Sequence, residues 1–284
     1  MRLALLITAT LIWGLGFVGT RWTLESYSPL WSNSLRYIFA GLLCIPYIAL
    51  KGTIKDKKGP LICSALLFLA LQLQTMGIAQ TTLAKSGFLT VFYSIFTPIL
   101  TLFLYGQRFR IGYWILLSVA MLGIFLLCDF EFSNFNAGDW LTLLSALFFS
   151  LHILAVDKFA KDLPAVEFNL LQCLYMGILG FIVGLAFEGP ISLAPLSTFA
   201  FPSPLLGFLV LSVFSSIIAF SFQVYAQQGT PPHIVSLAFL MESIFAAIFG
   251  YLFFAEKLTT MAMIGCALVL VSVALIPKMT RFEK

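Results

Sequence analysis

Ten long apolar segments, separated by short polar breaks, limit what this chain can fold into. A helix needs roughly 20 apolar residues to cross a bilayer, and the segments are continuous runs without the alternation of a membrane β-strand. The chain is 61% hydrophobic and 10% charged, whereas soluble domains have about 25% charged residues. The sequence therefore predicts an all-α polytopic membrane protein. The ten expected transmembrane helices are residues 3–20, 30–50, 60–80, 86–105, 111–128, 138–157, 166–187, 204–225, 233–253 and 260–277.

The two halves of the chain resemble each other. Residues 9–36 align with residues 145–172 at a constant offset of 136 positions. A second alignment, at an offset of 149, sets Gly106 and the residues after it against Ala255 and the residues after it. The identity between the halves is weak, so the matching order of apolar segments carries more weight than any single pair.

Each half contains five of the expected helices. Because five is an odd number, the two copies must cross the membrane in opposite orientations. Inverted repeats of this kind are common in secondary transporters, and the substrate site lies near the midplane between them. We predict one five-helix repeat in residues 1–128 and a second, inverted one in residues 138–284.

Lys and Arg are unevenly distributed between the expected loops. With the amino terminus in the cytoplasm, 12 of the 16 Lys and Arg residues lie on the cytoplasmic side and three on the other side, while Arg36 falls inside a span. This bias follows the positive-inside rule and predicts a multi-pass protein of the cytoplasmic (inner) cell membrane with both termini in the cytoplasm. The net charge of +4 thus reflects topology, and no nucleic-acid partner is expected.

The five cysteines are scattered through or beside the apolar segments, and no CxxC pair is present. Free cysteines of this kind usually pack as small apolar residues. We therefore expect no metal site and no cofactor.

Short motifs occur in a fixed order along nearly the whole chain. They are Trp13-Gly14 with Phe17, Arg36, the run from Ala79 to Thr90 that contains Lys85-Ser86-Gly87, Pro98, Gly106-Gln107-Arg108, Gly138-Asp139-Trp140, Glu242-Ser243 and Ala255-Glu256-Lys257. In this order and spacing the chain resembles the drug/metabolite transporter (DMT) superfamily, EamA type.

The resemblance implies an export or exchange carrier for small metabolites. It also implies that spans 1, 3, 4, 6, 8 and 9 surround a central cavity, with spans 5 and 10 outside it. Two positions depart from the family pattern: Gln107 stands where a Glu is usual, and Ser243 stands where a Pro is frequent. We expect the second departure to remove a kink from the ninth span, because Pro cannot supply a backbone N–H.

Three ionisable residues inside the expected spans are candidates for function, since a charge within the bilayer costs at least ~2.5 kcal/mol. Glu242 could bind a substrate amine, carry a coupling proton, or make a structural hydrogen bond. His152 could titrate near neutral pH or simply pack. Arg36 could bind a substrate carboxylate through two hydrogen bonds, extend to the membrane surface, or pair with Glu25 or with another helix.

Amide and aromatic side chains at a similar depth complete the candidate site. Gln72 and Gln74 are two positions apart and cannot both face one pathway; we take Gln72 as the candidate and leave Gln74 open. Gln223 shares a helix face with Gln227. The predicted substrate-binding residues are Trp13, Gln72, Tyr93, His152, Gln223 and Glu242, with Arg36 as a charge that serves the substrate or the structure.

The sequence thus predicts a transporter that moves amino acids or similar small amphipathic solutes by alternating access, in contact with the lipid bilayer and with protons as a candidate coupling ion. Gly180-x-x-x-Gly184 could form a homodimer face or pack within the chain. A membrane sensor without transport remains an alternative. An enzyme is disfavoured, because no HExxH, nucleophile elbow or phosphate-binding loop is present, and no catalytic residue is expected.

Overall fold

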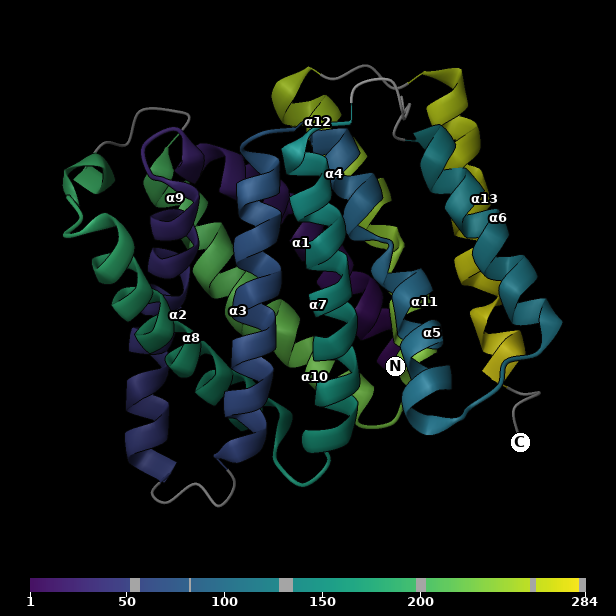
Figure 1. The fold of residues 1–284 in the computed structure, drawn as a ribbon, viewed down its shortest axis with the longest axis horizontal. Coiled ribbons are helices and arrows are strands. Elements are labelled where there is room, and N and C mark those ends of the chain that lie inside the picture. The colour runs from purple at the N-terminus through teal and green to yellow at the C-terminus, as the bar shows by residue number, and fades with distance from the viewer. Residues whose placement is uncertain (52–56, 82, 128–134, 198–202, 256–258, 281–284) are drawn as a thin grey trace.

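The computed structural model describes the chain except residues 52–56, 82, 128–134, 198–202, 256–258 and 281–284. The described residues form helices and connecting loops without strands (Figure 1). Seven helices are long and apolar enough to cross a membrane, and two further apolar helices, Ile111–Leu127 and Thr260–Leu275, are shorter. The predicted all-α polytopic fold is confirmed.

The helices of the first half are α1 (Arg2–Leu24), α2 (Pro29–Lys51), α3 (Lys58–Ile78), α4 (Leu83–Thr90), α5 (Tyr93–Tyr105) and α6 (Ile111–Leu127). Those of the second half are α7 (Ala137–Phe159), α8 (Ala165–Glu188), the short 3₁₀ helix η2 (Ala194–Ser197), α9 (Pro204–Leu209), the π-helical segment η3 (Val210–Ala219), α10 (Phe220–Gln227), α11 (Pro232–Phe239), α12 (Met241–Phe254) and α13 (Thr260–Thr280).

The fourth and ninth expected spans are each broken near their middle. One break separates α4 from α5 and the other separates α11 from α12, and both contain tight i→i−3 bonds: Ser94 N donates to Val91 O (2.9 Å) and Ser243 N to Leu240 O (3.3 Å). Ser243 and Leu240 follow Ser94 and Val91, respectively, by 149 positions. The expectation that Ser243 removes a kink is therefore wrong, because the tighter bonding interrupts the helix without a proline.

The ends of these two spans also match. Gly106, after α5, and Ala255, after α12, both adopt the left-handed conformation, with φ of 65° and 52°. They are the pair aligned at an offset of 149 in the sequence. Glycine adopts this conformation without strain, whereas alanine does so at a cost.

Helix packing is matched between the halves. The helix α2 packs on α8, and α6 packs on α13 along one side of the molecule (Figure 1). The helix α1 packs on the eighth span and on α12, while α7, its counterpart, packs on α3 and on α4–α5. Exchanging the halves reproduces this set of contacts, as a two-fold relation would.

The two ends of the helices define two faces of the molecule. Arg2 Nη1 donates to Gly229 O (3.2 Å), and Gln228 Nε2 donates to Ala160 O (2.7 Å), so the start of α1, the end of α7 and the end of α10 share the amino-terminal face. On the opposite face, Ser28 bonds Glu188. Spans that follow one another in the sequence therefore alternate in direction.

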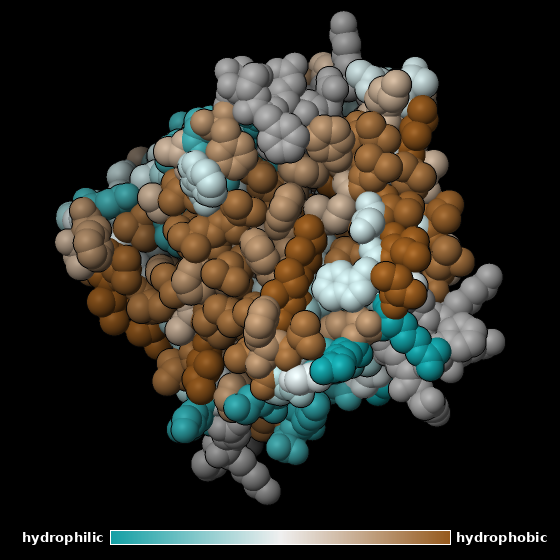
Figure 2. All heavy atoms as spheres, turned by 45° about the vertical axis from the view of Figure 1, so that its right-hand side comes forward, coloured by the Kyte–Doolittle hydropathy of each residue, from teal (hydrophilic) through white to brown (hydrophobic). Residues whose placement is uncertain are grey.

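The outer surface is apolar. Figure 2 shows a wide hydrophobic area with hydrophilic residues gathered along its lower edge. Phe103, Ile111 and Phe187 are each at least 75% exposed, and a surface this apolar requires contact with lipid. By contrast, Gly177 and Gly180 of α8 lie directly against Tyr37 and Ser34 of α2, so this small-residue face packs within the chain.

Candidate functional site

A cavity that is partly open to solvent, with about 590 Å³ of empty space, lies between the two halves. Its walls come from α1, α2, α3, α4, α5, α7, η3, α10, α11 and α12, whereas α6 and α13 supply none of the lining residues. The resemblance implied six surrounding spans, and the structure adds α2 through Arg36. The lining residues are Trp13, Gly16, Phe17, Thr20, Arg36, Leu71, Gln74, Ile78, Thr90, Tyr93, Phe149, His152, Ile153, Ser215, Phe220, Gln223, Phe239 and Glu242.

The structure brings most of the predicted site residues to this cavity: Trp13, Arg36, Tyr93, His152, Gln223 and Glu242 all line it. Gln72 does not, since its Oε1 lies 3.5 Å from Asn33 Nδ2 of α2. Gln74 lines the cavity instead and donates to Thr90 Oγ1 (3.1 Å). Gln74 therefore replaces Gln72 as the candidate substrate-binding residue of the third span.

Tyr93 and Glu242 meet at the centre of the site. The Tyr93 hydroxyl lies 3.3 Å from Glu242 Oε2 and 3.1 Å from Phe239 O. The two residues are 149 positions apart, so they occupy equivalent places in the two halves, each just after a helix break. The contact therefore joins matching positions of the two halves, and both residues line the cavity.

Most of the lining consists of such equivalent pairs. Gln74 corresponds to Gln223 at the offset of 149, and Trp13 corresponds to Phe149 at the offset of 136. Residues whose counterparts do not line the cavity are Thr20, Arg36, Ile78 and Ser215. Thr20 and Ile78 lie near the ends of α1 and α3 at the opposite face, so the cavity extends from its symmetric centre towards that face.

Arg36 is held inside the protein. Its side chain is 6% exposed, and Nε donates to Ser216 Oγ while Nη2 donates to Ser215 Oγ, both at 2.7 Å. Of the structural alternatives for Arg36, the structure shows contact with another helix, because both serines belong to η3 of the eighth span.

Aromatic rings connect the charged groups. Trp13 packs against Phe220 and Phe239, with ring centroids 4.9 and 5.0 Å apart. Tyr93 contacts Phe239 and Phe149 at 6.1 and 6.3 Å. These distances are typical of edge-to-face and tilted pairs. The rings give the cavity an apolar wall suited to a hydrocarbon or aromatic side chain.

A chain of amides fixes the orientation of Gln223. Gln227 Nε2 donates to Ile153 O (2.9 Å), so Gln227 Oε1 must accept from Gln223 Nε2 (2.7 Å). Gln223 Oε1 then has no hydrogen-bond partner among the described residues, and neither does Trp13 Nε1. One acceptor and one donor therefore remain for a bound solute. His152 Nε2 is already 3.1 Å from Gln172 Oε1.

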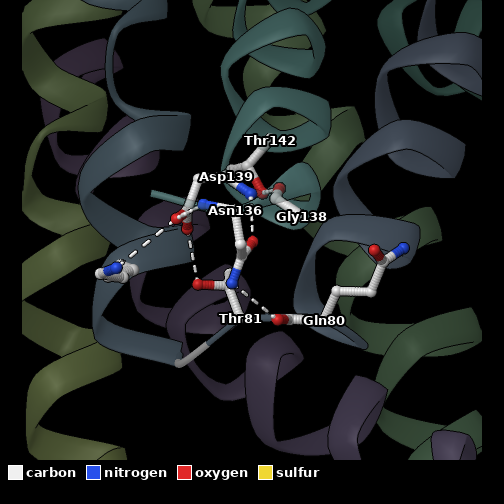
Figure 3. Close-up of polar contacts among 7 residues, drawn as sticks. Gln80, Thr81, Asn136, Gly138, Asp139 and Thr142 are labelled. Atoms are coloured by element: carbon white, nitrogen blue, oxygen red, sulfur yellow. Dashed lines mark hydrogen bonds and ion pairs between the residues drawn. The ribbon is translucent and has the colours of Figure 1, made fainter. Parts of the chain in front are cut away.

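A second polar cluster lies at the opposite face, outside the cavity (Figure 3). The carboxylate of Asp139, at the start of α7, accepts from Thr81 Oγ1 (2.6 Å) and pairs with Lys85 Nζ (3.5 Å). Asn136 Nδ2 donates to Gln80 O (3.1 Å). The cluster ties the α3–α4 junction to α7. Its equivalent on the amino-terminal face is the Arg2–Gly229 bond, since Gly229 follows Gln80 by 149 positions.

Some lining residues were missed by the sequence interpretation. Phe149 was not among the predicted site residues, and the available signal was its alignment with Trp13 at the offset of 136 positions. Ser215 carried no signal, because serine is common in apolar helices. In the part of the chain that the structure describes, no group of three His, Cys, Asp or Glu side chains is arranged to hold a metal ion.

Apolar membrane-crossing helices in two matched halves, with a cavity between them whose mainly apolar wall carries a few polar side chains, are typical of the class of membrane transporters. The chain belongs to the EamA-like transporter family, whose model matches residues 1–128 and 136–277. This assignment confirms the resemblance to the drug/metabolite transporter superfamily.

Two relatives are similar to this chain over 95% of its length. The chain is 27% identical over 272 residues to an uncharacterized transporter of Archaeoglobus fulgidus, a match that covers 95% of this chain and 84% of the relative. It is 25% identical over 293 residues to a WAT1-related chloroplastic protein of Arabidopsis thaliana, covering 95% and 68%. A solved crystal structure with 17% identity has a TM-score of 0.78 and covers 100% of this chain and 99% of the other, which shows the shared fold alone.

Proposed function

We propose that this protein transports amino acids, or similar small zwitterionic solutes, by alternating access. The observation that carries the proposal is the presence of a guanidinium group, Arg36, and a carboxyl group, Glu242, on the wall of one largely aromatic cavity. A free amino acid presents the complementary charges on adjacent atoms and an apolar side chain beyond them. Each charged group inside the membrane is costly and therefore calls for a role.

Arg36 is the partner for the solute carboxylate. Its two serine contacts use the Nε–Nη2 edge of the guanidinium, which leaves the Nη1–Nη2 edge for a ligand. Glu242, supported by the Tyr93 hydroxyl, is the partner for the ammonium group. Sugar phosphates fit poorly, because they require several cations and the cavity offers Arg36 alone among its described lining residues.

The arrangement of the halves supports the proposal of alternating access. We infer that residues 1–128 and 138–284 are inverted repeats that rock against each other around the Tyr93–Glu242 contact. The breaks at Val91–Phe92 and at Leu240 supply places where backbone angles change without unfolding a span. In this proposal the amino-terminal face is the cytoplasmic side of the inner cell membrane, and Glu242 is the group that binds a coupling proton.

Counterflow in liposomes tests the proposal. Purified protein, reconstituted and loaded with unlabelled amino acids, should accumulate labelled amino acid, and an imposed pH gradient should stimulate the uptake. Glu242→Gln should lose the response to the gradient, whereas Glu25→Gln, which changes a carboxylate at the end of α1, should retain it.

Each other result has a definite meaning. Uptake that ignores the gradient and the Glu242 substitution would make the protein a facilitator. Binding of amino acids without flux would favour a membrane sensor. No binding and no flux for any amino acid would contradict the proposed substrate class.

A further inference from the structure

The eighth span differs from its counterpart in backbone geometry. Residues Val210–Ala219 form the π-helical segment η3, whereas the equivalent third span is the regular helix α3 (Lys58–Ile78). Such segments are rare and are frequently found at functional sites. This one lies on the cavity wall, where Ser215 is one of the lining residues without a lining counterpart.

The segment holds Arg36 with both of its adjacent serines. Ser215 and Ser216 are at most 2% exposed, and each accepts one bond of 2.7 Å from the guanidinium. In a regular helix, adjacent residues point about 100° apart. A π-helix has more residues in each turn, so the angle between adjacent side chains about the helix axis is smaller. Both hydroxyl groups can therefore reach the same planar side chain.

The segment η3 is also held by hydrogen bonds from α8. Asn169 of α8 is fully buried, and its Nδ2 lies 2.9 Å from Ser216 O, 3.0 Å from Ile217 O and 3.1 Å from Ser221 Oγ. These contacts satisfy carbonyl oxygens at the C-terminal part of η3. Arg36 on one side and Asn169 on the other thus fix the same short stretch of backbone.

We propose that Ser215 and Ser216 are positioning residues that keep the Arg36 guanidinium in the cavity, and thereby make one end of a symmetric cavity the carboxylate end of the solute site. This inference rests on the proposed function. Without the two hydroxyl groups, the long Arg36 side chain would reach the opposite face, where water solvates its charge. The π-helical segment is therefore the feature that makes the two ends of the otherwise matched cavity different, since it fixes the end that binds the carboxylate.

The first test compares a carboxylate-bearing solute with its decarboxylated analogue. In counterflow, L-leucine and isoamylamine compete for the site, and only leucine has the carboxylate. Substitution of both serines (Ser215→Ala with Ser216→Ala) should raise the half-saturating leucine concentration about 10-fold and leave inhibition by isoamylamine unchanged. Ser215→Thr with Ser216→Thr retains both hydroxyl groups and should restore leucine affinity.

Ser212→Ala is the matched control. Ser212 lies in the same segment, is 2% exposed, and its hydroxyl has no partner among the described residues. It should leave both affinities unchanged. An equal loss for leucine and isoamylamine in the double variant would overturn the proposal, because it would indicate general damage to the cavity.

A second test needs no solute and therefore separates this inference from the substrate proposal. Phenylglyoxal modifies accessible arginines, and peptide mass spectrometry gives the rate at each position. Relative to Arg21, modification of Arg36 should be at least about 5-fold faster in the double serine variant than in wild type or Ser212→Ala. Equal rates would overturn the inference even if amino acids proved to be the solutes.

Discussion

At the scale of single residues, Ala255 stands in a conformation that its side chain opposes. Its φ of 52° is the one positive value among the described non-glycine residues, and the equivalent position in the first half is Gly106. The left-handed conformation costs an alanine roughly 1 kcal/mol. The same turn thus occurs in both halves, but only the copy at Ala255 is strained.

Ala255→Gly should stabilise the protein by about 0.5–1 kcal/mol, the conformational gain less the added entropy of the unfolded chain. Gly106→Ala should destabilise it by a similar amount. Reversible unfolding of the detergent-solubilised protein measures both. Gly112→Ala is the control, because its Cβ would meet open space and its φ is not left-handed; a loss of stability there would discredit the comparison.

The glutamines give a second prediction at this scale. Gln74→Ala and Gln223→Ala should each reduce amino-acid counterflow at least about 5-fold, since both amides line the cavity and a lost hydrogen bond in a buried site costs about 1 kcal/mol. Gln72→Ala should leave counterflow within about 2-fold of wild type. A larger loss for Gln72 than for Gln74 would contradict the assignment.

The sequence could identify most of the candidate residues because an ionisable group in an apolar span is costly wherever it points. It could not choose between Gln72 and Gln74, since the apolar residues of the third span surround the whole helix and leave no polar face that would indicate which side meets the cavity. The role of the two serines that bind Arg36 could not be predicted from the sequence either. Their role depends on a π-helical backbone and on contact between spans that are distant in sequence.

At the scale of elements, the Asp139 cluster joins α7 to the junction of α3 and α4. The carboxylate is fully buried and caps its own helix through Asn136 N (2.9 Å) while it binds Thr81 and Lys85. Removing one partner of a buried charged pair leaves the other without compensation, which is more damaging than the loss of an exposed pair.

Asp139→Asn should therefore destabilise the protein by about 2 kcal/mol, as measured by unfolding in detergent. Asp157→Asn provides a control within the same helix, because Asp157 is 27% exposed and pairs with the exposed Lys161 at 3.6 Å. Its expected effect is below about 0.5 kcal/mol. Equal effects of the two substitutions would show that the cluster is no stronger than a surface ion pair.

The expected spans match the observed helices closely, because the apolar runs are long and the polar breaks between them are clear. The interruptions inside the fourth, eighth and ninth spans had no counterpart in the pattern, since hydropathy at Val91 or Leu240 is as high as elsewhere. Backbone breaks next to a cavity arise from hydrogen bonding and packing, which composition alone does not encode.

At the scale of the whole molecule, α1 begins and α13 ends towards the same side of the molecule (Figure 1). In the proposed topology ten crossings connect these two ends, and the distribution of Lys and Arg predicts that their side is the cytoplasmic one. The matched packing of the halves agrees with such a topology, although the choice of side comes from charge alone.

Reporter fusions measure this choice. Green fluorescent protein fused after Lys284 should fluoresce, and alkaline phosphatase fused there should be inactive. Fusions within the expected loop 189–203 should give the reverse, because that loop lies on the other side and contains no Lys or Arg. Active phosphatase at the carboxyl terminus would contradict the proposed orientation.

The Tyr93–Glu242 contact resembles an interface between two subunits that have been joined into one polypeptide. In a dimer of identical subunits, the residue on the axis would meet its own copy, so a glutamate would face a glutamate and two carboxylates would repel each other. In this single chain the two positions carry different residues, and a donor meets an acceptor. A single chain is what permits one carboxylate, with its own hydrogen-bond partner, at the centre of a two-fold site.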